Sequence, residues 1–171
     1  MTTLRAANGT ITLLVLAAAA HLCAAADEPV QRLYSGRVVF LEEALKERGI
    51  DTTEETGKHV VLVTEDGEIL PILANWRGRA FYQDEKLRNR RVELIGFQHH
   101  GLAYLNVISV YTFDEEGERM FTDYWCDVCS IPMYEIKPCD CCQGPIRLRF
   151  QPKELPDYIR SPEPPASPKD E

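Results

Sequence analysis

The chain is short of positive charge, and after residue 26 it has no long apolar run. Its 171 residues include 19 Lys and Arg against 27 Asp and Glu, a net charge of −8. Non-specific binding to nucleic acid or to an anionic membrane needs a basic face, so this balance argues against both. No segment after residue 26 approaches the ~20 apolar residues that span a bilayer. No constellation of nucleophile, base and acid stands out, so an enzymatic role is uncertain and less expected than binding.

The first 26 residues have the pattern of a removable secretion signal. Arg5 is the only charge before Asp27, residues 11–20 are apolar or small apart from one threonine, and residues 24–26 are an A-x-A cleavage site. We therefore expect residues 1–26 to be removed and the protein to be exported, to the periplasm or outside the cell. Retention of the segment as an anchor is the alternative. Loss of Arg5 takes the net charge from −8 to −9.

Cysteine is absent between Cys23, which belongs to the expected signal, and Cys126. The remaining five cysteines lie within 17 consecutive residues: Cys126, Cys129, Cys139, Cys141 and Cys142. A disulfide framework joins distant parts of a chain, whereas a cluster this tight ties one segment to itself. The odd count also leaves one thiol over, whichever pairing is chosen. The distribution therefore favours a metal site.

Four of these cysteines form two Cys-x-x-Cys pairs, Cys126 with Cys129 and Cys139 with Cys142, separated by nine residues. Two such pairs provide the four thiolates of a tetrahedral site, with Zn–S bonds of about 2.3 Å. We therefore predict a structural Zn²⁺ site with these four ligands, and Cys141 as a spare thiol or an exchanged ligand. Iron in the same four-thiolate cage is the less expected cofactor.

Two other uses of the cysteines remain open. Export normally places a protein in an oxidising compartment, where one or two disulfides would form. The stretch Trp125-Cys126-Asp127-Val128-Cys129 also has the Trp-Cys-x-x-Cys pattern of thioredoxin-like oxidoreductases, which need a helix N-terminus to activate the first thiol. Pro132 interrupts any helix there, so redox catalysis is the weaker alternative.

Residues typical of strands recur along the chain between turn signals. The expected strands are 33–40, 59–64, 68–73, 91–97, 102–113 and 118–125. Residues 41–48 are strong helix formers followed by a glycine, and residues 76–87 suggest a short helix or an irregular crossover. Turns about every ten residues predict a mainly β fold, as a small barrel rather than a sandwich.

The barrel region resembles an OB-fold, in particular the compact exported OB-type domains of bacteria. The resemblance rests on Gly36-Arg37-Val38-Val39, on the Asp66-Gly67 hairpin, and on the run from Leu87 to Gly96 that leads to Leu105-Asn106-Val107. Asn89 replaces a glycine of the usual run. The resemblance implies an OB-like β-barrel domain at 33–122 with one or two short helices, and it carries no chemistry of its own.

The cysteine segment resembles zinc-ribbon and rubredoxin-like proteins over residues 124–150. Gly144 lies just past the second pair, where such loops turn back towards the metal, whereas Ser130 stands where the first loop would have glycine. The resemblance implies a zinc-ribbon-like appendage at 123–150. Residues 151–171 are rich in proline and acids and are expected to form a disordered tail.

One cationic and aromatic stretch is a candidate binding groove. Its residues are Trp76, Arg77, Arg79, Phe81, Tyr82 and Arg88. OB-folds commonly bind single strands through stacking aromatics in a basic groove, although the acidic chain makes nucleic acid an unlikely partner. A groove for a peptide, a sugar or a partner protein fits the same residues, as does a solvated surface.

The sequence as a whole predicts an exported, metal-stabilised binding module without an enzymatic role. Its partner would be an unknown protein or small ligand of the cell envelope, and no membrane span remains after signal removal. The first alternative is a thiol-disulfide oxidoreductase or metal-handling protein that uses the Cys-x-x-Cys pairs. The second is a single-stranded nucleic-acid-binding OB protein.

Overall fold

The structure is a computed structural model that describes residues 29–160. The expected signal peptide, residues 1–26, and residues 161–171 of the expected tail lie outside the described residues. Between residues 29 and 160, none of the helices is both long enough and apolar enough to cross a membrane.

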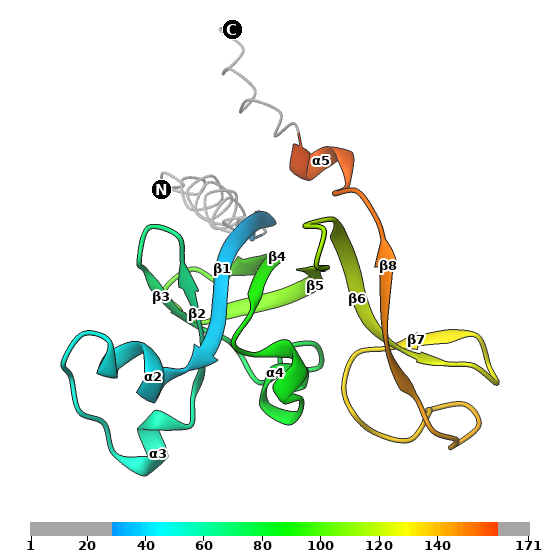
Figure 1. Cartoon of the computed structure of the whole chain (residues 1–171), viewed down its shortest axis with the longest axis horizontal. Coiled ribbons are helices and arrows are strands. Elements are labelled where there is room, and N and C mark those ends of the chain that lie inside the picture. The colour runs from blue at the N-terminus through cyan, green and yellow to red at the C-terminus, as the bar shows by residue number, and fades with distance from the viewer. Residues whose placement is uncertain (1–28, 161–171) are drawn as a thin grey trace, which may run out of the picture.

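Eight strands form one antiparallel sheet that coils on itself (Figure 1). They are β1 (Arg32–Phe40), β2 (Val60–Thr64), β3 (Ile69–Pro71), β4 (Arg91–Gln98), β5 (Leu105–Phe113), β6 (Arg119–Cys126), β7 (Ile131–Met133) and β8 (Arg147–Pro152). The helical elements are short: α2 (Leu41–Lys46), α3 (Glu54–Gly57), α4 (Arg79–Gln83), the 3-10 turn η2 (Glu85–Leu87) and α5 (Asp157–Arg160). The predicted mainly β fold is confirmed.

The first five strands close into a ring. β1 pairs with β2 on one side and with β4 on the other, β2 continues to β3, and β4 continues to β5. The ring closes where Ile72 bridges Leu105 in parallel, just past the end of β3, and the Leu73 N–H donates to the Leu105 carbonyl at 3.0 Å. The helix α4 fills the connection between β3 and β4.

The interior of this ring is the main hydrophobic core. Fully buried residues from each wall meet there, among them Val38 of β1, Leu62 of β2, Leu94 of β4 and Leu105 of β5. Phe81, on α4, is also fully buried and covers one end of the ring. Each such side chain contributes about 1.5–3 kcal/mol on burial, so these residues hold the ring closed.

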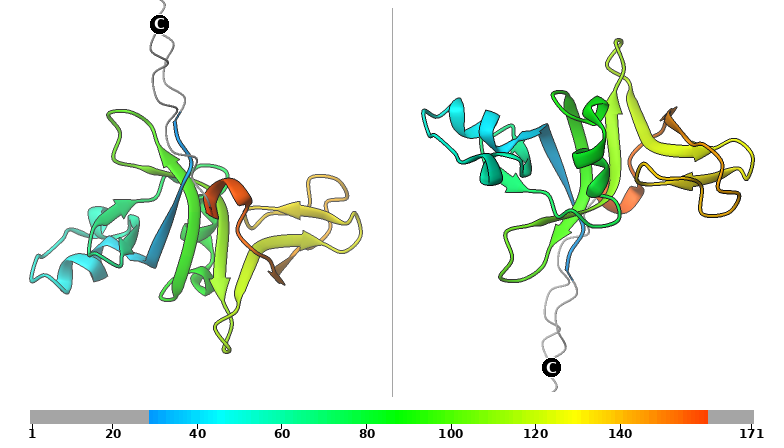
Figure 2. Two further views of the ribbon diagram at one scale, coloured as in Figure 1. Left: turned by 90° about the horizontal axis from the view of Figure 1, so that it is seen from above. Right: turned by 90° about the horizontal axis from the view of Figure 1, so that it is seen from below.

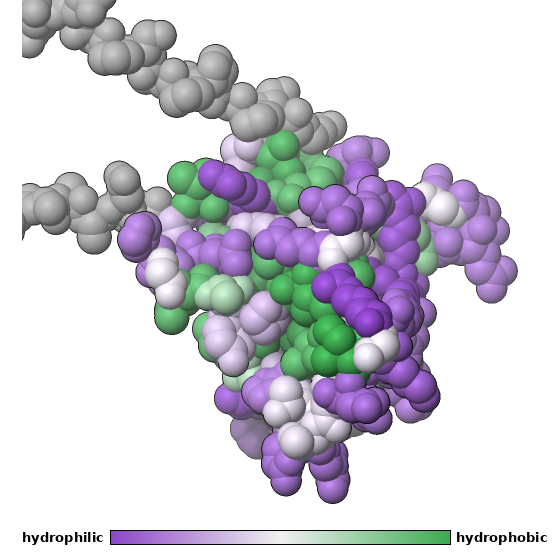
Figure 3. Space-filling view, turned by 90° about the vertical axis from the view of Figure 1, so that its left-hand side faces the viewer, coloured by the Kyte–Doolittle hydropathy of each residue, from purple (hydrophilic) through white to green (hydrophobic). Residues whose placement is uncertain are grey.

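A second, smaller core lies outside the ring, where α2 packs on β1 and β2. Val39, Ala44 and Val61 are its buried members. Apolar side chains remain visible among hydrophilic ones on the side of the molecule where β2, β3 and α2 lie (Figure 3). Within β1, Gly36 allows the strands to approach closely, because a Cβ there would lie 2.1 Å from the Val63 carbonyl oxygen.

The strand β6 belongs both to the barrel and to the cysteine segment. Its first half pairs with β5, its second half with β7, and β8 runs along its other edge. Figure 2 shows β7 and the second half of β6 projecting away from the ring. The boundary expected between residues 122 and 123 therefore falls inside a continuous strand, since the ladder with β8 crosses it.

The chain after residue 150 is ordered further than predicted. Residues 151 and 152 complete β8, α5 follows, and Leu155 is buried against Ile95 and Tyr111. These apolar contacts hold the segment against the barrel although its composition is rich in proline. The expected disordered tail therefore does not include residues 151–160.

Candidate metal centre

Two loops at the far end of the β6–β8 ribbon bring the cysteines together. β6 ends at Cys126, and the turn to β7 contains Cys129. The second pair, Cys139 and Cys142, lies in the loop between β7 and β8. Because β6 pairs with both β7 and β8, the two loops emerge side by side from the same ribbon.

The two loops have the same local structure. Both read Cys-Asp-x-Cys, followed by a residue with positive φ: Ser130 at 54° and Gln143 at 57°. In both, the N–H of that residue donates to the carbonyl of the first cysteine, at 2.8 Å to Cys126 and 2.9 Å to Cys139. The left-handed residue turns the chain back so that both thiols of a loop point the same way. Ser130 thus adopts the left-handed conformation at the position where the ribbon resemblance expects a glycine.

The sulfur atoms of Cys126, Cys129, Cys139 and Cys142 all lie within 4.8 Å of one another. In a tetrahedron with metal–sulfur bonds of about 2.3 Å, the sulfurs are about 3.8 Å apart. The Cys126 and Cys142 sulfurs are 3.5 Å apart, well beyond a disulfide bond of about 2.05 Å. Cys126 and Cys139 are buried, while Cys129 and Cys142 are more open to solvent. The arrangement is that of a four-thiolate cage that could hold a metal ion.

Backbone N–H groups favour the thiolate form of the first cysteine in each loop, but they lower the pKa of only one of the two. Those of Cys142 and Cys141 lower the pKa of Cys139 to about 7. For Cys126, the N–H of Cys129 acts in the same direction, but burial and the neighbouring thiols outweigh it and raise the pKa. Hydrogen bonding with the Cys141 thiol, and then with Cys142, raises the pKa of Cys129. Of these three thiols, only Cys139 has a lowered pKa.

The aspartate of each loop anchors it by an ion pair. Asp127 accepts two hydrogen bonds from the Arg147 guanidinium, both at 2.9 Å, across the β6–β8 ribbon. Asp140 pairs with Lys137 at 3.1 Å within its own loop. These contacts restrain the loops from outside the cage.

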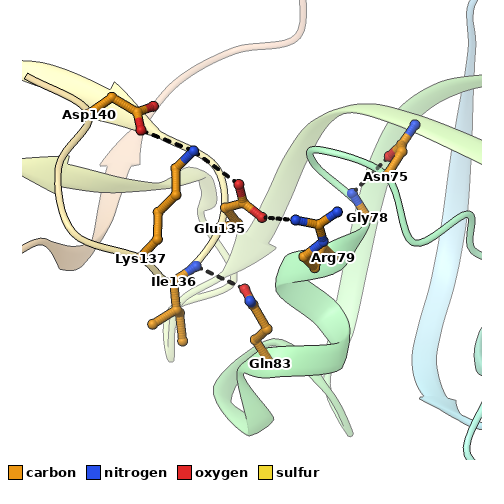
Figure 4. Close-up of polar contacts among 8 residues, drawn as sticks. All are labelled: Asn75, Gly78, Arg79, Gln83, Glu135, Ile136, Lys137 and Asp140. Atoms are coloured by element: carbon orange, nitrogen blue, oxygen red, sulfur yellow. Dashed lines mark hydrogen bonds and ion pairs between the residues drawn. The ribbon is translucent and has the colours of Figure 1, made fainter.

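The spacer between the two cysteine pairs is held against α4 of the barrel (Figure 4). Glu135, almost buried, accepts from Arg79 at 2.8 Å and from Lys137 at 3.1 Å. The backbone N–H of Ile136 donates to Gln83 Oε1 at 2.9 Å. Nearby, the Tyr124 hydroxyl donates to Asp84 at 2.7 Å. The cysteine loops are thereby fixed relative to the barrel and not merely tethered to it.

The six residues of the candidate groove do not form one surface. Phe81 is fully buried, and the Tyr82 hydroxyl donates to the Ile72 carbonyl at 2.9 Å. The Arg88 guanidinium donates to the Phe81 carbonyl at 2.6 Å. Arg79 is engaged with Glu135. These four residues serve packing and internal contacts.

The other two groove residues form an exposed aromatic group with a residue that the sequence did not suggest. Trp76, 57% exposed, meets the Tyr134 ring edge-on with centroids 4.8 Å apart. The Arg77 guanidinium lies over the Tyr134 ring at 3.4 Å. Tyr134 lies in the spacer between the cysteine pairs, so the group bridges the barrel and the ribbon. No local sequence signal points to this contact across 57 residues.

Cys141 lies beside the four-sulfur cage but is not part of it. Its side chain is exposed to solvent. Among the described residues, the cysteine cage is the one group of ligands that meets as a metal site. The repeated Cys-Asp-x-Cys pattern was the sequence signal that could have revealed the equivalence of the two loops.

Comparisons of the chain with protein-family models, with curated proteins and with solved structures find no match.

Proposed function

We propose that Cys126, Cys129, Cys139 and Cys142 hold one structural Zn²⁺ that orders the ribbon of a binding module. The observation that carries the proposal is the convergence of all four sulfurs within 4.8 Å, from two loops that share a left-handed residue and the same backbone hydrogen bond. A structural zinc supplies apparent binding energy of about 10–16 kcal/mol. The ribbon has little core of its own, so a metal of this strength suits it.

The barrel supports an OB-like assignment for the rest of the module. Five strands close in the order β1-β2-β3-β5-β4, with a short helix between β3 and β4. An OB-fold is a five-stranded Greek-key barrel that binds ligands on its surface. Together with the secretion-type N-terminus, this supports an exported binding protein of the cell envelope, with a protein or small ligand as its partner.

The aromatic group at the junction is the surface we favour for that partner. Trp76 is exposed, and Tyr134 is held beside it by the spacer between the cysteine pairs. Aromatic side chains and arginine are enriched where binding energy concentrates. In this arrangement the metal positions Tyr134, so loss of the metal would disturb the surface.

The first experiment is native mass spectrometry of the chain from Asp27, with and without a strong chelator. The expected result is a mass excess of one zinc that the chelator removes. Matched variants sharpen it: Cys139→Ser should abolish the excess, whereas Cys141→Ser should retain it. An excess fitting iron, with visible absorption, would replace zinc by iron, and a metal-free mass short of pairs of hydrogens would overturn the proposal in favour of disulfides.

The thiol oxidoreductase alternative requires a Cys-x-x-Cys pair at the start of a helix. Cys126 ends a strand, and neither pair opens a helix in the described part of the chain. The lowered pKa of Cys139 is the observation on its side. Reduction of a disulfide substrate by the zinc-free chain, lost in Cys139→Ser, would support that alternative over a structural site.

A further inference from the structure

We propose that the start of β1 and the turn between β4 and β5, residues 99–104, form a binding site for a small phosphate monoester. The site shares no residue with the cysteine cage or with the exposed group of Trp76 and Tyr134. It therefore adds a small-ligand site to the proposed binding module and does not depend on a bound metal.

The site is a surface cleft of about 320 Å³. Small-molecule pockets in proteins have volumes of about 300–1,000 Å³, so the cleft suits a ligand at the small end of that range. Donor side chains and apolar side chains line it together, and no carboxylate is among the lining residues. The donors are Arg32, Tyr34, His99 and His100, and the apolar residues are Pro29 and Val30.

The register of the sheet brings the two sides of the cleft together. Arg32 pairs with Gly96 and Tyr34 with Leu94, so the start of β1 runs beside the end of β4. β4 ends at Gln98, and the two histidines follow directly in the turn. The cleft thus joins segments that are far apart in the chain, so no local sequence pattern reveals it.

The turn that carries the histidines is restrained. The Leu102 N–H donates to the His99 carbonyl at 3.0 Å. Gly101, at the third position of this turn, has a φ of 77°, a conformation that suits glycine. The His99 ring lies edge-on to the Phe97 ring, with centroids 5.0 Å apart. The turn and this ring are therefore ordered before a ligand arrives, which lowers the entropic cost of binding.

The charge of the cleft is positive, although the chain as a whole carries a net charge of −8. Arg32 forms no ion pair with any carboxylate of residues 29–160. Burial above all raises the pKa of Tyr34, while Arg32 lowers it and Glu68, which does not line the cleft, raises it. The Tyr34 hydroxyl therefore keeps its proton as a donor. A cleft lined by charge of one sign concentrates ligands of the opposite sign.

The donor set indicates the class of anion. Arg32 offers a planar fork of N–H groups, each histidine offers at least one N–H, and Tyr34 offers a hydroxyl. A phosphate monoester presents three terminal oxygens and close to two negative charges, whereas a carboxylate has two oxygens and one charge. The Val30 side chain is 68% exposed at the cleft, where it can cover the organic part of the ligand. A phosphate monoester thus uses both kinds of lining residue.

The test uses the zinc-loaded chain from Asp27 with phenyl phosphate as the probe. Calorimetry at fixed ionic strength measures the affinity, and amide chemical shifts locate the site. We expect the shifts to concentrate in residues 30–34 and 98–101. Phenyl phosphate should bind more tightly than inorganic phosphate, which has no organic part, and more tightly than benzoate, which has fewer oxygens and less charge.

Two arginine variants of equal net charge test the role of the cleft. Arg32→Gln should weaken phenyl phosphate binding by at least about tenfold, because it removes charge-assisted hydrogen bonds. Arg91→Gln is the matched control and should bind as the wild type does. Arg91 is likewise an exposed arginine at the first residue of a strand, and it does not line the cleft. Tyr34→Phe keeps the ring and should weaken binding several-fold, and thermal unfolding checks that each variant is folded.

Each other outcome overturns a stated part of the proposal. Equal losses in Arg32→Gln and Arg91→Gln, or shifts that map outside the cleft, overturn the site. Benzoate that binds as tightly as phenyl phosphate overturns the phosphate class, and inorganic phosphate that does so overturns the monoester. Zinc content, measured separately by native mass spectrometry, enters none of these results, so the proposed metal site and this cleft can fail independently.

Discussion

Ser130 and Gln143 occupy the same place in the two cysteine loops and share a left-handed backbone, with φ of 54° and 57°. A residue with a Cβ pays about 1–2 kcal/mol for this conformation. Each donates its N–H to the carbonyl of the cysteine four residues earlier. The loops keep the conformation because that hydrogen bond and the convergence of the thiols depend on it.

Ser130→Gly and Gln143→Gly should each stabilise the zinc-loaded protein. Glycine adopts positive φ without the steric cost but has more freedom in the unfolded chain, so the net gain is about 0.5–1 kcal/mol. Thermal unfolding at fixed zinc concentration measures it. Val128→Gly is the control: Val128 has no positive φ, so the same change should lower stability by about 0.4–1 kcal/mol. Equal effects at all three positions would contradict the role assigned to the left-handed residues.

Zinc removal should loosen the ribbon and leave the barrel folded. The barrel has its own buried core, to which the cysteine loops at 126–130 and 139–145 contribute no residue. Hydrogen exchange after chelation should therefore quicken in these loops by at least about tenfold, with little change in β4. Simultaneous loss of protection in both regions would mean that the metal supports the whole domain.

Arg149 and Arg147 make the same type of contact in different surroundings, so they should differ in their effect on stability. Each forms a two-pronged pair across the ribbon, Arg149 with Asp123 and Arg147 with Asp127. The Asp123 side chain is 1% exposed, and Arg149 14%. Arg149→Ala would leave a buried carboxylate unpaired, which costs about 3–5 kcal/mol. Arg147→Ala, on an exposed pair, should change stability little.

Urea unfolding at neutral pH measures both arginine variants. Adding Asp123→Asn to Arg149→Ala should recover part of the loss, because the unpaired charge is then gone. Equal losses in the two arginine variants would show that burial is not what distinguishes the pairs.

Tyr124 should make the protein sensitive to alkali. Burial, and then the hydrogen bond to Asp84, raises the pKa of Tyr124 above the 10.0 of a free phenol. The unfolded chain therefore ionises first. The stability contributed by the neutral phenol is fully present below pH ~10 and is lost as the pH rises from there towards the folded pKa.

Tyr124→Phe tests this pH dependence. At neutral pH it should cost about 1–2 kcal/mol, because Asp84 loses a buried donor. Above pH ~10 the difference in unfolding free energy between the variant and the wild type should narrow, because the wild type loses stability as Tyr124 ionises in the unfolded chain and phenylalanine cannot ionise. Tyr158→Phe, at an exposed position, is the control and should follow the wild type throughout. A difference in unfolding free energy that stays constant with pH would argue against a raised pKa of Tyr124.

Local patterns were enough to predict most of the strands. The structure places β1, β4 and β6 within one or two residues of the expected ranges, because β-branched and aromatic residues between turn signals define a strand whatever its partners. The four cysteines were predictable for a similar reason. Each pair lies within one turn, so the short spacing itself brings the two thiols together.

The six residues predicted to form a groove do not lie on one surface, because local sequence does not decide which side chains are exposed to solvent. Phe81 and Trp76 are both aromatic residues in the same stretch, yet Phe81 is buried in the barrel and Trp76 is exposed. Which side faces the core depends on where β3 and β5 meet, and Ile72 and Leu105 are far apart in the chain. The order of residues 151–160 likewise depends on Leu155 finding Ile95 and Tyr111.

The sequence by itself determined six of the eight strands, but not β7 and β8, together with the turns and the two thiol pairs. All of these arise from residues within a few positions of one another. Only the tertiary structure decided that the two pairs face each other, that Ser130 can replace a glycine, and that Cys141 stays outside the cage. These features depend on β6 pairing with β7 and β8 and on Glu135 reaching Arg79. Contacts of that range arise from the free energy of the whole packed molecule, which no local pattern contains.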